Sequence, residues 1–508
     1  MAEKSVFAKR TLKDIHDEIR SVYLGDNRPW ILGFSGGKDS TCMVQLIWGA
    51  LSELPPGKLA KRIYIISSDT LVESPKIVEQ ITTTLDMMEK ASKKTSLPVS
   101  TNLVRPVTED TFWVCLLGKG FPAPSNLFRW CTERLKIRNA DRFIQERVSE
   151  YGEAVVVLGT RKDESGSRQQ LMNLYEIEGS LLSRHSKFAQ TYVYTPLRDF
   201  TAKDVWSYLL QKENPWGANN RDLLAVYQNA NASECPLVVD STTPSCGNSR
   251  FGCWTCTVVE DDVSLRNTIE SGEDWMEPLL ELRDELKATQ NPVVRKKVRS
   301  LKRRTGQMKL IDDSRKKAFD EKIQESKMEL KAAGSDGKIT DPYAKLVPGP
   351  YTLEFCQEFL EKILVAQKKV RQTGPDPHLC LIQDEEIHEI QRIWRMERGD
   401  WKNTAYQIYE RVLEEKLVPP QEDLGGFGVV EQDLLEEICN KHGVPALLVS
   451  KLLNTEHESQ GMAQHSRIYP KITKVLSEEW RDDLGAIVHE LEQQKSEMKR
   501  FTGGGNGA

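Results

Sequence analysis

Ile31-Leu32-Gly33-Phe34-Ser35-Gly36-Gly37-Lys38-Asp39-Ser40 is the stretch of this sequence that decides the fold. An apolar run from Trp30 to Phe34 enters a turn with two adjacent glycines, and residues 41–51 continue as a mostly apolar helical pattern. The stretch therefore predicts a strand, a loop and a helix in succession. Because glycine has no Cβ, backbone N–H groups of such a loop can close on a phosphate, and the helix N-terminus adds positive charge.

The side chains of this loop predict a nucleotide site. Lys38 supplies a full positive charge, and we expect Lys38 and Asp39 to be its catalytic residues. The spacing differs from that of the G-x-x-x-x-G-K-[ST] loop. It resembles instead the PP-loop of the ATP pyrophosphatases, which split ATP between its α and β phosphates. The expected nucleotide ligands of the loop are Ser35, Gly36, Gly37, Lys38, Asp39 and Ser40.

Composition limits the class of protein. The chain has 508 residues, of which 29% are charged and 39% hydrophobic, so we expect two or three globular domains. Ten cysteines in a chain of this size are not a secreted disulfide scaffold, and neither a leader nor a membrane-spanning run is evident. We therefore expect a cytoplasmic protein without a membrane partner.

Further apolar runs predict parallel strands whose carboxyl ends carry polar residues. Residues 62–70 end in Asp69, which is placed to contact the nucleotide or its metal, although a simple helix cap is the alternative. Residues 153–160 lead into Arg161 and Arg168, which can grip a phosphate through a planar guanidinium group. The alternative for these arginines is solvated loop charge.

A broader resemblance links these segments. Five motifs follow one another in an order that resembles the 3′-phosphoadenylylsulfate reductase family. They are the phosphate loop, Ser-Asp-Thr, Arg-Trp-Cys-Thr, Gly-Thr-Arg-x-x-Glu-Ser-x-x-Arg and Pro-Leu-x-Asp-x-Thr-x-x-Asp-Val-Trp. The resemblance spans residues 25–230. It implies an α/β fold, with a mostly parallel, twisted sheet of five or six strands and helices on both faces. It also implies an enzyme that binds adenine nucleotides and handles sulfur.

Four cysteines are candidate metal ligands. Cys246, Cys253 and Cys256 have a C-x₆-C-x₂-C spacing, and the intervening glycines permit tight turns. No histidine lies nearby, which favours an all-sulfur 4Fe-4S cluster over zinc or a redox thiol set. Cys131, beside Arg129 and Arg134 at a helix start, is the expected fourth ligand, and we expect its pKa to be lowered, although a buried inert thiol is the alternative. Cys235 is the rival ligand, and an iron left open for sulfide is a further alternative.

The cysteine spacing resembles one particular family within this group of enzymes. The stretch Cys-Gly-Asn-Ser-Arg-Phe-Gly-Cys-Trp-Thr-Cys after a PP-loop domain, followed by a long basic part, resembles the DndC family, sulfurtransferases of DNA phosphorothioation systems. The resemblance implies replacement of a non-bridging DNA phosphate oxygen by sulfur. The implied partners are DNA, a cysteine desulfurase as sulfur donor, and other subunits of the phosphorothioation complex.

The C-terminal part reads as an α-helical extension. Residues 287–331 hold 15 Lys and Arg against 6 Asp and Glu, which predicts contacts with phosphates, while a solvated helix face is the alternative. Residues 274–330 are expected to be helical. Further helices are expected at residues 351–370, 384–397, 405–417, 431–442, 444–454 and 472–498. The domain limits that we predict are 1–235 for the PP-loop domain, 236–270 for the cysteine-rich segment and 271–508 for the extension.

A mechanism follows from these expectations. Cleavage of ATP transfers AMP to an oxygen of the DNA phosphodiester, with Mg²⁺ bridging the phosphates, and sulfide held on the cluster then displaces AMP. Three other readings stay open: a reductase acting on adenylylated sulfate, a transfer RNA thiolation enzyme, and a DNA-binding scaffold that only senses ATP. The sequence does not indicate the DNA sequence modified or the oligomeric state.

Overall fold

The computed structural model describes residues 5–230, 252–311, 345–420, 428–457 and 468–503. It divides into two compact units. The first comprises residues 1–111 and 124–283, and the second comprises residues 112–123 and 284–508. The predicted domain limit at residue 235 lies outside the described residues. None of the described helices is both long and apolar enough to cross a membrane.

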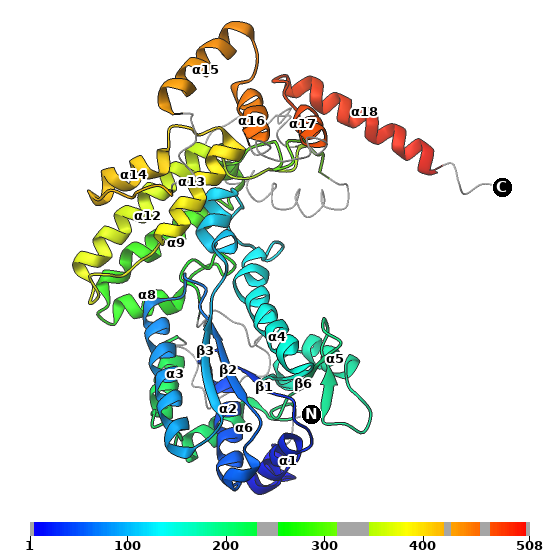
Figure 1. Cartoon of the computed structure of the whole chain (residues 1–508), viewed down its shortest axis with the longest axis vertical. Helices are drawn as coiled ribbons and strands as arrows, with labels where there is room; N and C mark the ends of the chain where they lie inside the picture. Colours follow the sequence, from blue (N-terminus) through cyan, green and yellow to red (C-terminus); the bar gives the residue numbers. More distant parts are fainter. Residues whose placement is uncertain (1–4, 231–251, 312–344, 421–427, 458–467, 504–508) are drawn as a thin grey trace, which may run out of the picture. The chain divides into compact units, whose positions relative to one another are not determined.

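A six-stranded sheet forms the centre of the first unit (Figure 1). Its strand order is β3-β2-β1-β4-β6-β5, and every neighbouring pair is parallel except β5 and β6. The parallel register places Trp30 of β1 opposite Ile63 of β2 and Val155 of β4. The strands are β1 (Trp30–Gly33), β2 (Ile63–Ser68), β3 (Val99–Val104), β4 (Ala154–Val157), β5 (Leu182–Arg184) and β6 (Thr191–Tyr194).

Helices cover both faces of this sheet, because alternate strand residues are apolar on both sides. One face packs against α4, where Ile144 contacts a cluster containing Ile31 and Tyr64. The other face packs against α1, α2, α3 and α6 in a larger core. The helices of this unit are α1 (Leu12–Leu24), α2 (Lys38–Ser52), α3 (Pro75–Thr95), α4 (Arg138–Tyr151), α5 (Gly166–Leu174), α6 (Ala202–Gln211), α7 (Asn220–Ala230) and α8 (Val263–Glu270).

The predicted fold class is confirmed: a mostly parallel sheet with helices on both faces, and a helical C-terminal part. A capping box begins α6, since the Thr201 hydroxyl accepts from the N–H of Asp204 and the Asp204 carboxylate accepts from the N–H of Thr201. The structure adds α5, a short exposed helix that weak hydrophobic periodicity did not indicate.

The second unit is built from helices and takes in a short piece of the N-terminal half. Residues 112–123 pack within it: the indole of Trp113 donates to the carbonyl of Leu381, and that of Trp394 donates to the carbonyl of Leu117. Its helices are the last turns of α9 (Glu277–Ala288), then α10 (Pro292–Val298), α12 (Leu353–Thr373), α13 (Asp384–Arg398), α14 (Thr404–Leu413), α15 (Val429–His442), α16 (Ala446–His457), α17 (Ile468–Leu476) and α18 (Leu484–Gly503).

Two expected helices differ in this unit. The helical pattern expected over residues 274–330 is broken at residues 289–291 and again after Val298, where the N–H of Ser300 donates to the carbonyl of Pro350 and the Arg299 side chain donates to the carbonyls of residues 348–349. The part of this expectation that covers residues 312–330 lies outside the described residues. The helix expected over residues 472–498 is interrupted after Leu476, where the N–H of Glu479 donates to the carbonyl of Gly306. After Val298 and after Leu476, a distant backbone partner replaces the next helical hydrogen bond.

Candidate functional site at the carboxyl edge of the sheet

The predicted phosphate loop connects β1 directly to α2. Gly36 has a φ of +74°, a conformation that favours glycine, and Gly37 is the N-cap of α2. The N–H of Ser35 donates to the hydroxyl of Ser40, which in turn donates to the carbonyl of Gly37 at 3.0 Å. The loop is therefore preformed around the N-terminus of a 15-residue helix, the arrangement that binds phosphate.

Charges in the loop are paired with a residue that follows β4. Arg161 is only 2% exposed, and its Nε lies 2.7 Å from Oδ1 of Asp39. Its other contact is with Asp163. Lys38 Nζ lies 3.1 Å from Oδ2 of the same Asp39. One carboxylate oxygen of Asp39 thus pairs with the buried Arg161, and the other pairs with Lys38. These ion pairs fix the direction of the Lys38 side chain.

Two neighbours of the loop were not predicted from the sequence. The hydroxyl of Tyr227, from α7, accepts from the N–H of Lys38 at 3.1 Å, and Lys38 Nζ lies 5.3 Å from the centre of the tyrosine ring. A Cβ at Gly159, just after β4, would lie 2.8 Å from the carbonyl oxygen of Asp39. Gly159 thus permits close packing of the strand end on the loop, and only its place after a strand could have indicated this.

Asp69 and Thr70 follow β2, the neighbour of β1, and are both buried. The Asp69 carboxylate accepts from Nε of Arg105 and from the N–H of Leu71, each at 2.9 Å. The hydroxyl of Thr70 lies 3.3 Å from the sulfur of Cys253. Asp69 therefore lies at the sheet edge where it was predicted, and the adjacent residue contacts a predicted cluster ligand.

The C-x₂-C segment forms a tight turn against the end of β2. The N–H of Cys256 donates to the carbonyl of Cys253 at 3.1 Å. Trp254 N–H donates to the carbonyl of Val72, and Ser74 N–H to that of Gly252, so the turn pairs with residues 72–74. The two cysteines thus lie on the same unit and at the same sheet edge as the residues that follow β2.

A buried arginine binds the backbone of this cysteine turn. Arg283 is buried, and its guanidinium donates to the carbonyls of Cys256, Val259 and Glu260. The buried hydroxyl of Thr257 donates to the carbonyl of Pro124 at 2.7 Å. The sequence gives no sign of either contact, because each joins segments that are distant along the chain.

Charged groups surround the sulfur of Cys253. Glu73 Oε1 lies 3.6 Å from this sulfur and 3.0 Å from Nζ of Lys136. Burial, and next the Glu73 carboxylate, raise the pKa of Cys253 far above its usual value. Burial alone would lower the pKa of Lys136, but Cys253 and Glu73 raise it overall. Lys136 acts in the opposite sense and lowers the pKa of Cys253, but burial and Glu73 outweigh it, so these surroundings favour the thiol over the thiolate.

Cys131 belongs to the same neighbourhood. Burial raises the pKa of its thiol, and the nearby Cys256 raises it further. The expectation that Arg129 and Arg134 lower this pKa is wrong. Arg129 donates to the amide oxygen of Asn126 and Arg134 to the carboxylate of Asp110, so burial dominates at the cysteine.

The donor chemistry fits a thiolate-bound cluster, because Cys256 influences both Cys131 and Cys253 electrostatically. Cys246 and Cys235 lie outside the described residues. Within the described residues, no three His, Cys, Asp or Glu side chains are gathered closely enough to hold a metal ion. The ligand set therefore stays a prediction.

Arg168 has different surroundings from Arg161. It is exposed, at the start of α5, and its side chain pairs with Glu164. Its own N–H donates to the hydroxyl of Ser165, which caps the helix. An exposed guanidinium in this position is accessible to an incoming anion, whereas Arg161 is already occupied by two carboxylates.

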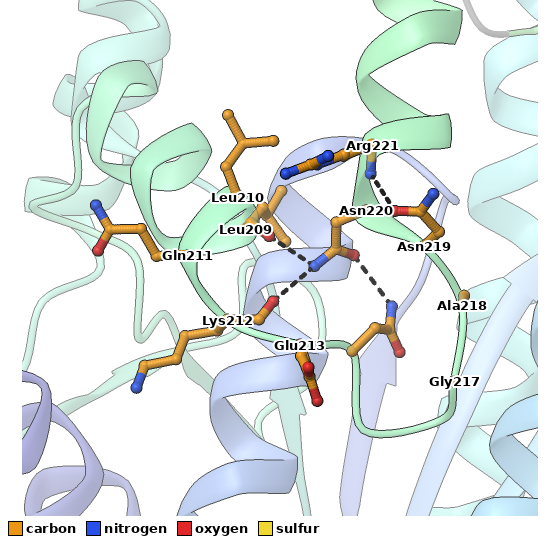
Figure 2. A pocket seen from close by; sticks show the side chains of 11 residues that line it. Leu209, Leu210, Gln211, Lys212, Glu213, Gly217, Ala218, Asn219, Asn220 and Arg221 are labelled. Atoms are coloured by element: carbon orange, nitrogen blue, oxygen red, sulfur yellow. Dashed lines mark hydrogen bonds between the residues drawn. The ribbon is translucent and has the colours of Figure 1, made fainter.

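Figure 2 shows a pocket of about 400 Å³ between α6 and α7. Its lining runs from Leu209 to Arg221 and contains none of the predicted site residues. The buried amide of Asn220 donates to the carbonyls of Leu209 and Lys212, so it is used to close the turn. We therefore place the functional site at the sheet edge and not in this pocket.

Residues 29–259 match the sequence model of the phosphoadenosine phosphosulfate reductase domain. This part of the chain is a phosphoadenosine phosphosulfate reductase-like domain. It contains the nucleotide loop, the polar ends of β1, β2 and β4, and all of the predicted cysteine ligands. The predicted resemblance to this family is thereby confirmed for the domain, while the resemblance to DndC stays a prediction.

Three proteins are similar to parts of this chain. An uncharacterized protein of Methanocaldococcus jannaschii is 26% identical over 242 residues, which are 48% of this chain and 39% of that protein. The phosphoadenylyl-sulfate reductase of Candida auris, solved as a phosphate complex, is 13% identical, with 44% of this chain and 95% of that chain covered and a TM-score of 0.27. The U34-tRNA thiolase NcsA of Methanococcus maripaludis, solved with its [4Fe-4S] cluster, is 15% identical, with 44% and 73% covered and a TM-score of 0.25. This chain therefore spans less than half of the Methanocaldococcus relative's length.

Proposed function

We propose that this protein is a sulfurtransferase that activates a DNA backbone phosphate with ATP and replaces a non-bridging oxygen by sulfur. The observation that carries the proposal is the pairing of residues 252–254 with residues 72–74. This contact brings the cysteine turn to the end of β2, next to the strand that leads into the nucleotide loop. A site for activation and a site for sulfur then belong to one edge of one domain.

The loop residues supply the first step. A phosphate oxygen of DNA attacks the α phosphorus of ATP, forms a new P–O bond and releases pyrophosphate. Lys38 and the loop N–H groups stabilise the charge that develops on pyrophosphate. The ion pair with Arg161 fixes the position of Asp39, and the carboxylates of Asp39 and Asp69 are the hard oxygen ligands that Mg²⁺ prefers.

The cysteine neighbourhood supplies the second step. Cys131, Cys246, Cys253 and Cys256 would hold a 4Fe-4S cluster, which when bound would provide a place for sulfide. This sulfide is released from the persulfide of a cysteine desulfurase by a dithiol reductant, which becomes a disulfide. Sulfide displaces AMP, which leaves with the original phosphate oxygen, so that a P–S bond replaces a P–O bond. Lys136 and Arg168, each about half exposed, offer positive charge to the anionic reactants.

The test uses the full chain under anaerobic conditions with ATP, Mg²⁺, duplex DNA, cysteine, a cysteine desulfurase and dithiothreitol as the reductant that releases sulfide. We expect phosphorothioate dinucleotides after nuclease digestion, together with DNA-dependent release of pyrophosphate. The Lys38→Ala variant should lose about 10²–10³-fold of the pyrophosphate release. Lys93→Ala, an exposed lysine on α3, is the matched control and should be unchanged.

Other products would overturn the proposal. Sulfite formed from adenylylated sulfate would assign the protein to the reductases, and the match of residues 29–259 to a reductase domain is the observation that favours this second candidate. Thiolated nucleosides in transfer RNA with no change in DNA would assign it to RNA thiolation. ATP binding without pyrophosphate release in the presence of DNA would indicate a non-catalytic DNA-binding scaffold.

A further inference from the structure

An exposed apolar turn lies immediately before Cys131. Ser125 and Phe128 exchange two backbone hydrogen bonds, of 3.0 and 3.3 Å, and so close a two-residue turn at Asn126 and Leu127. The side chain of Leu127 is 96% exposed and that of Phe128 is 46% exposed. Scattered exposed apolar residues are common on protein surfaces, whereas these two are neighbours at the tip of a turn that directly precedes Cys131.

The turn is fixed at both ends by the residues that build the cysteine site. On one side, Thr257, one residue after Cys256, donates to the carbonyl of Pro124. On the other side, the buried Trp130 precedes Cys131, and Thr132 N–H donates to the carbonyl of Arg129. The tip is therefore held out from the core by a rigid base, so Leu127 is preorganised to contact another molecule.

The charge around the turn favours an anionic partner. Residues 129–138 contain four basic residues and one acidic residue, Glu133. Arg134 and Arg138 pair with Asp110 and Lys136 pairs with Glu73, so Arg129 is the basic residue of this segment that lies at the turn itself. Arg129 is bonded to the amide oxygen of Asn126, a neutral group, so its positive charge stays at the tip of the turn. A partner that combines flat apolar groups with a high density of negative charge is a nucleic acid, whose stacked bases alternate with phosphates.

Building on the proposed function, we propose that Leu127 and Phe128 act as a wedge that enters a nucleic-acid duplex between neighbouring base pairs, with Arg129 on an adjacent phosphate. Apolar side chains that enter base steps unstack them and kink the duplex. A kink at this position turns one backbone phosphate out of the regular helix and toward the cysteines that follow the wedge in sequence. The wedge thus selects which phosphodiester reaches the site.

The experiment measures unstacking directly. Duplex DNA carrying 2-aminopurine is mixed with the full chain, and fluorescence is compared among the wild type, a Leu127→Ala/Phe128→Ala variant and a Leu171→Ala/Leu174→Ala control. The control removes two leucines of α5 that are also exposed, by 54% and 73%. We expect a severalfold rise in fluorescence for the wild type and the control, no rise for the wedge variant, and about tenfold weaker DNA binding by that variant.

The remaining outcomes separate this proposal from the proposed function. ATP binding and the melting temperature of the wedge variant should equal those of the wild type, which excludes misfolding. An equal rise in fluorescence for the wedge variant would overturn the wedge, as would a variant that still unstacks DNA but no longer binds the cysteine desulfurase. If transfer RNA is unstacked and DNA is not, the wedge stands and the proposed DNA substrate falls. If DNA is sulfurated without any unstacking, the wedge falls and the proposed function stands.

Discussion

Arg161 and Arg168 were predicted together as phosphate ligands, yet their side chains have opposite surroundings. Arg161 is buried and holds Asp39 and Asp163, while Arg168 is exposed beside Glu164. The sequence shows only that both follow a strand. Arg161 is the arginine that forms internal ion pairs, because Asp39, which follows β1, lies close to the end of β4. The missing side chain of Gly159 permits this close packing.

We expect alanine substitutions of the two arginines to have different effects on stability and on anion binding. Arg161→Ala leaves the Asp39 carboxylate without its buried partner and should lower the free energy of unfolding by about 2–3 kcal/mol. Arg168→Ala should change it by less than about 0.5 kcal/mol and weaken anion binding instead. Urea unfolding and nucleotide binding by the two variants measure both effects. Equal stability losses would contradict the assigned roles.

At the scale of elements, the start of α6 makes stability depend on pH. Burial alone would raise the pKa of Asp204, but hydrogen bonds from Ser5, Thr201 and the N–H of Val6 lower it overall. The ionised carboxylate therefore stabilises the fold above the unfolded pKa of about 3.9. This contribution is lost as the pH falls through the lower pKa of the folded state.

The Asp204→Asn variant should accordingly lose about 1–2 kcal/mol of stability at pH 7, because the cap and the contact with the N-terminal segment both weaken. The difference from the wild type should shrink as the pH is lowered toward 3. Urea midpoints across this pH range measure it, with Asp86→Asn on the exposed side of α3 as control. A constant difference at every pH would show that Asp204 is not the titrating group.

Elements with a strong local pattern were predictable, and contacts between distant segments were not. The buried strands appear as apolar runs, and the loop around Gly36 and Gly37 carries its own turn chemistry. The docking of the cysteine turn on residues 72–74 joins segments about 180 residues apart, so nothing local encodes it. The end of α10 at Val298 has the same cause, since Arg299 is held by carbonyls of residues 348–349.

At the scale of the whole molecule, the chain crosses between its two units more than once. Residues 112–123 leave the reductase-like unit and pack with the helical unit, where Gly120 has a φ of +69° and lies against Arg398, Pro350 and Tyr351. Residues 118–124 are rich in glycine and proline, a composition that also occurs in flexible linkers. The glycines are instead required by close packing and a left-handed backbone, which composition alone does not distinguish.

A chain ending at residue 283 should therefore associate in solution, because its Trp113 and Leu116, buried in the full chain, would be exposed. Replacing residues 112–123 by a short Gly/Ser segment in the truncated chain should restore a monomer. Size-exclusion chromatography with light scattering compares the two forms. A monomeric truncated chain with residues 112–123 retained would contradict the division into units.

The central claim is that the nucleotide loop and the cysteine turn share one edge of the sheet. The most direct measurement is ³¹P NMR of a bound non-hydrolysable ATP analogue, with the protein anaerobically reconstituted with iron and sulfide and then reduced to a paramagnetic state. We predict that reduction broadens the phosphate signals in the wild type, and that Cys253→Ser abolishes the broadening while the analogue stays bound. Sharp phosphate signals from reduced protein that carries both stoichiometric iron and bound analogue would contradict the claim.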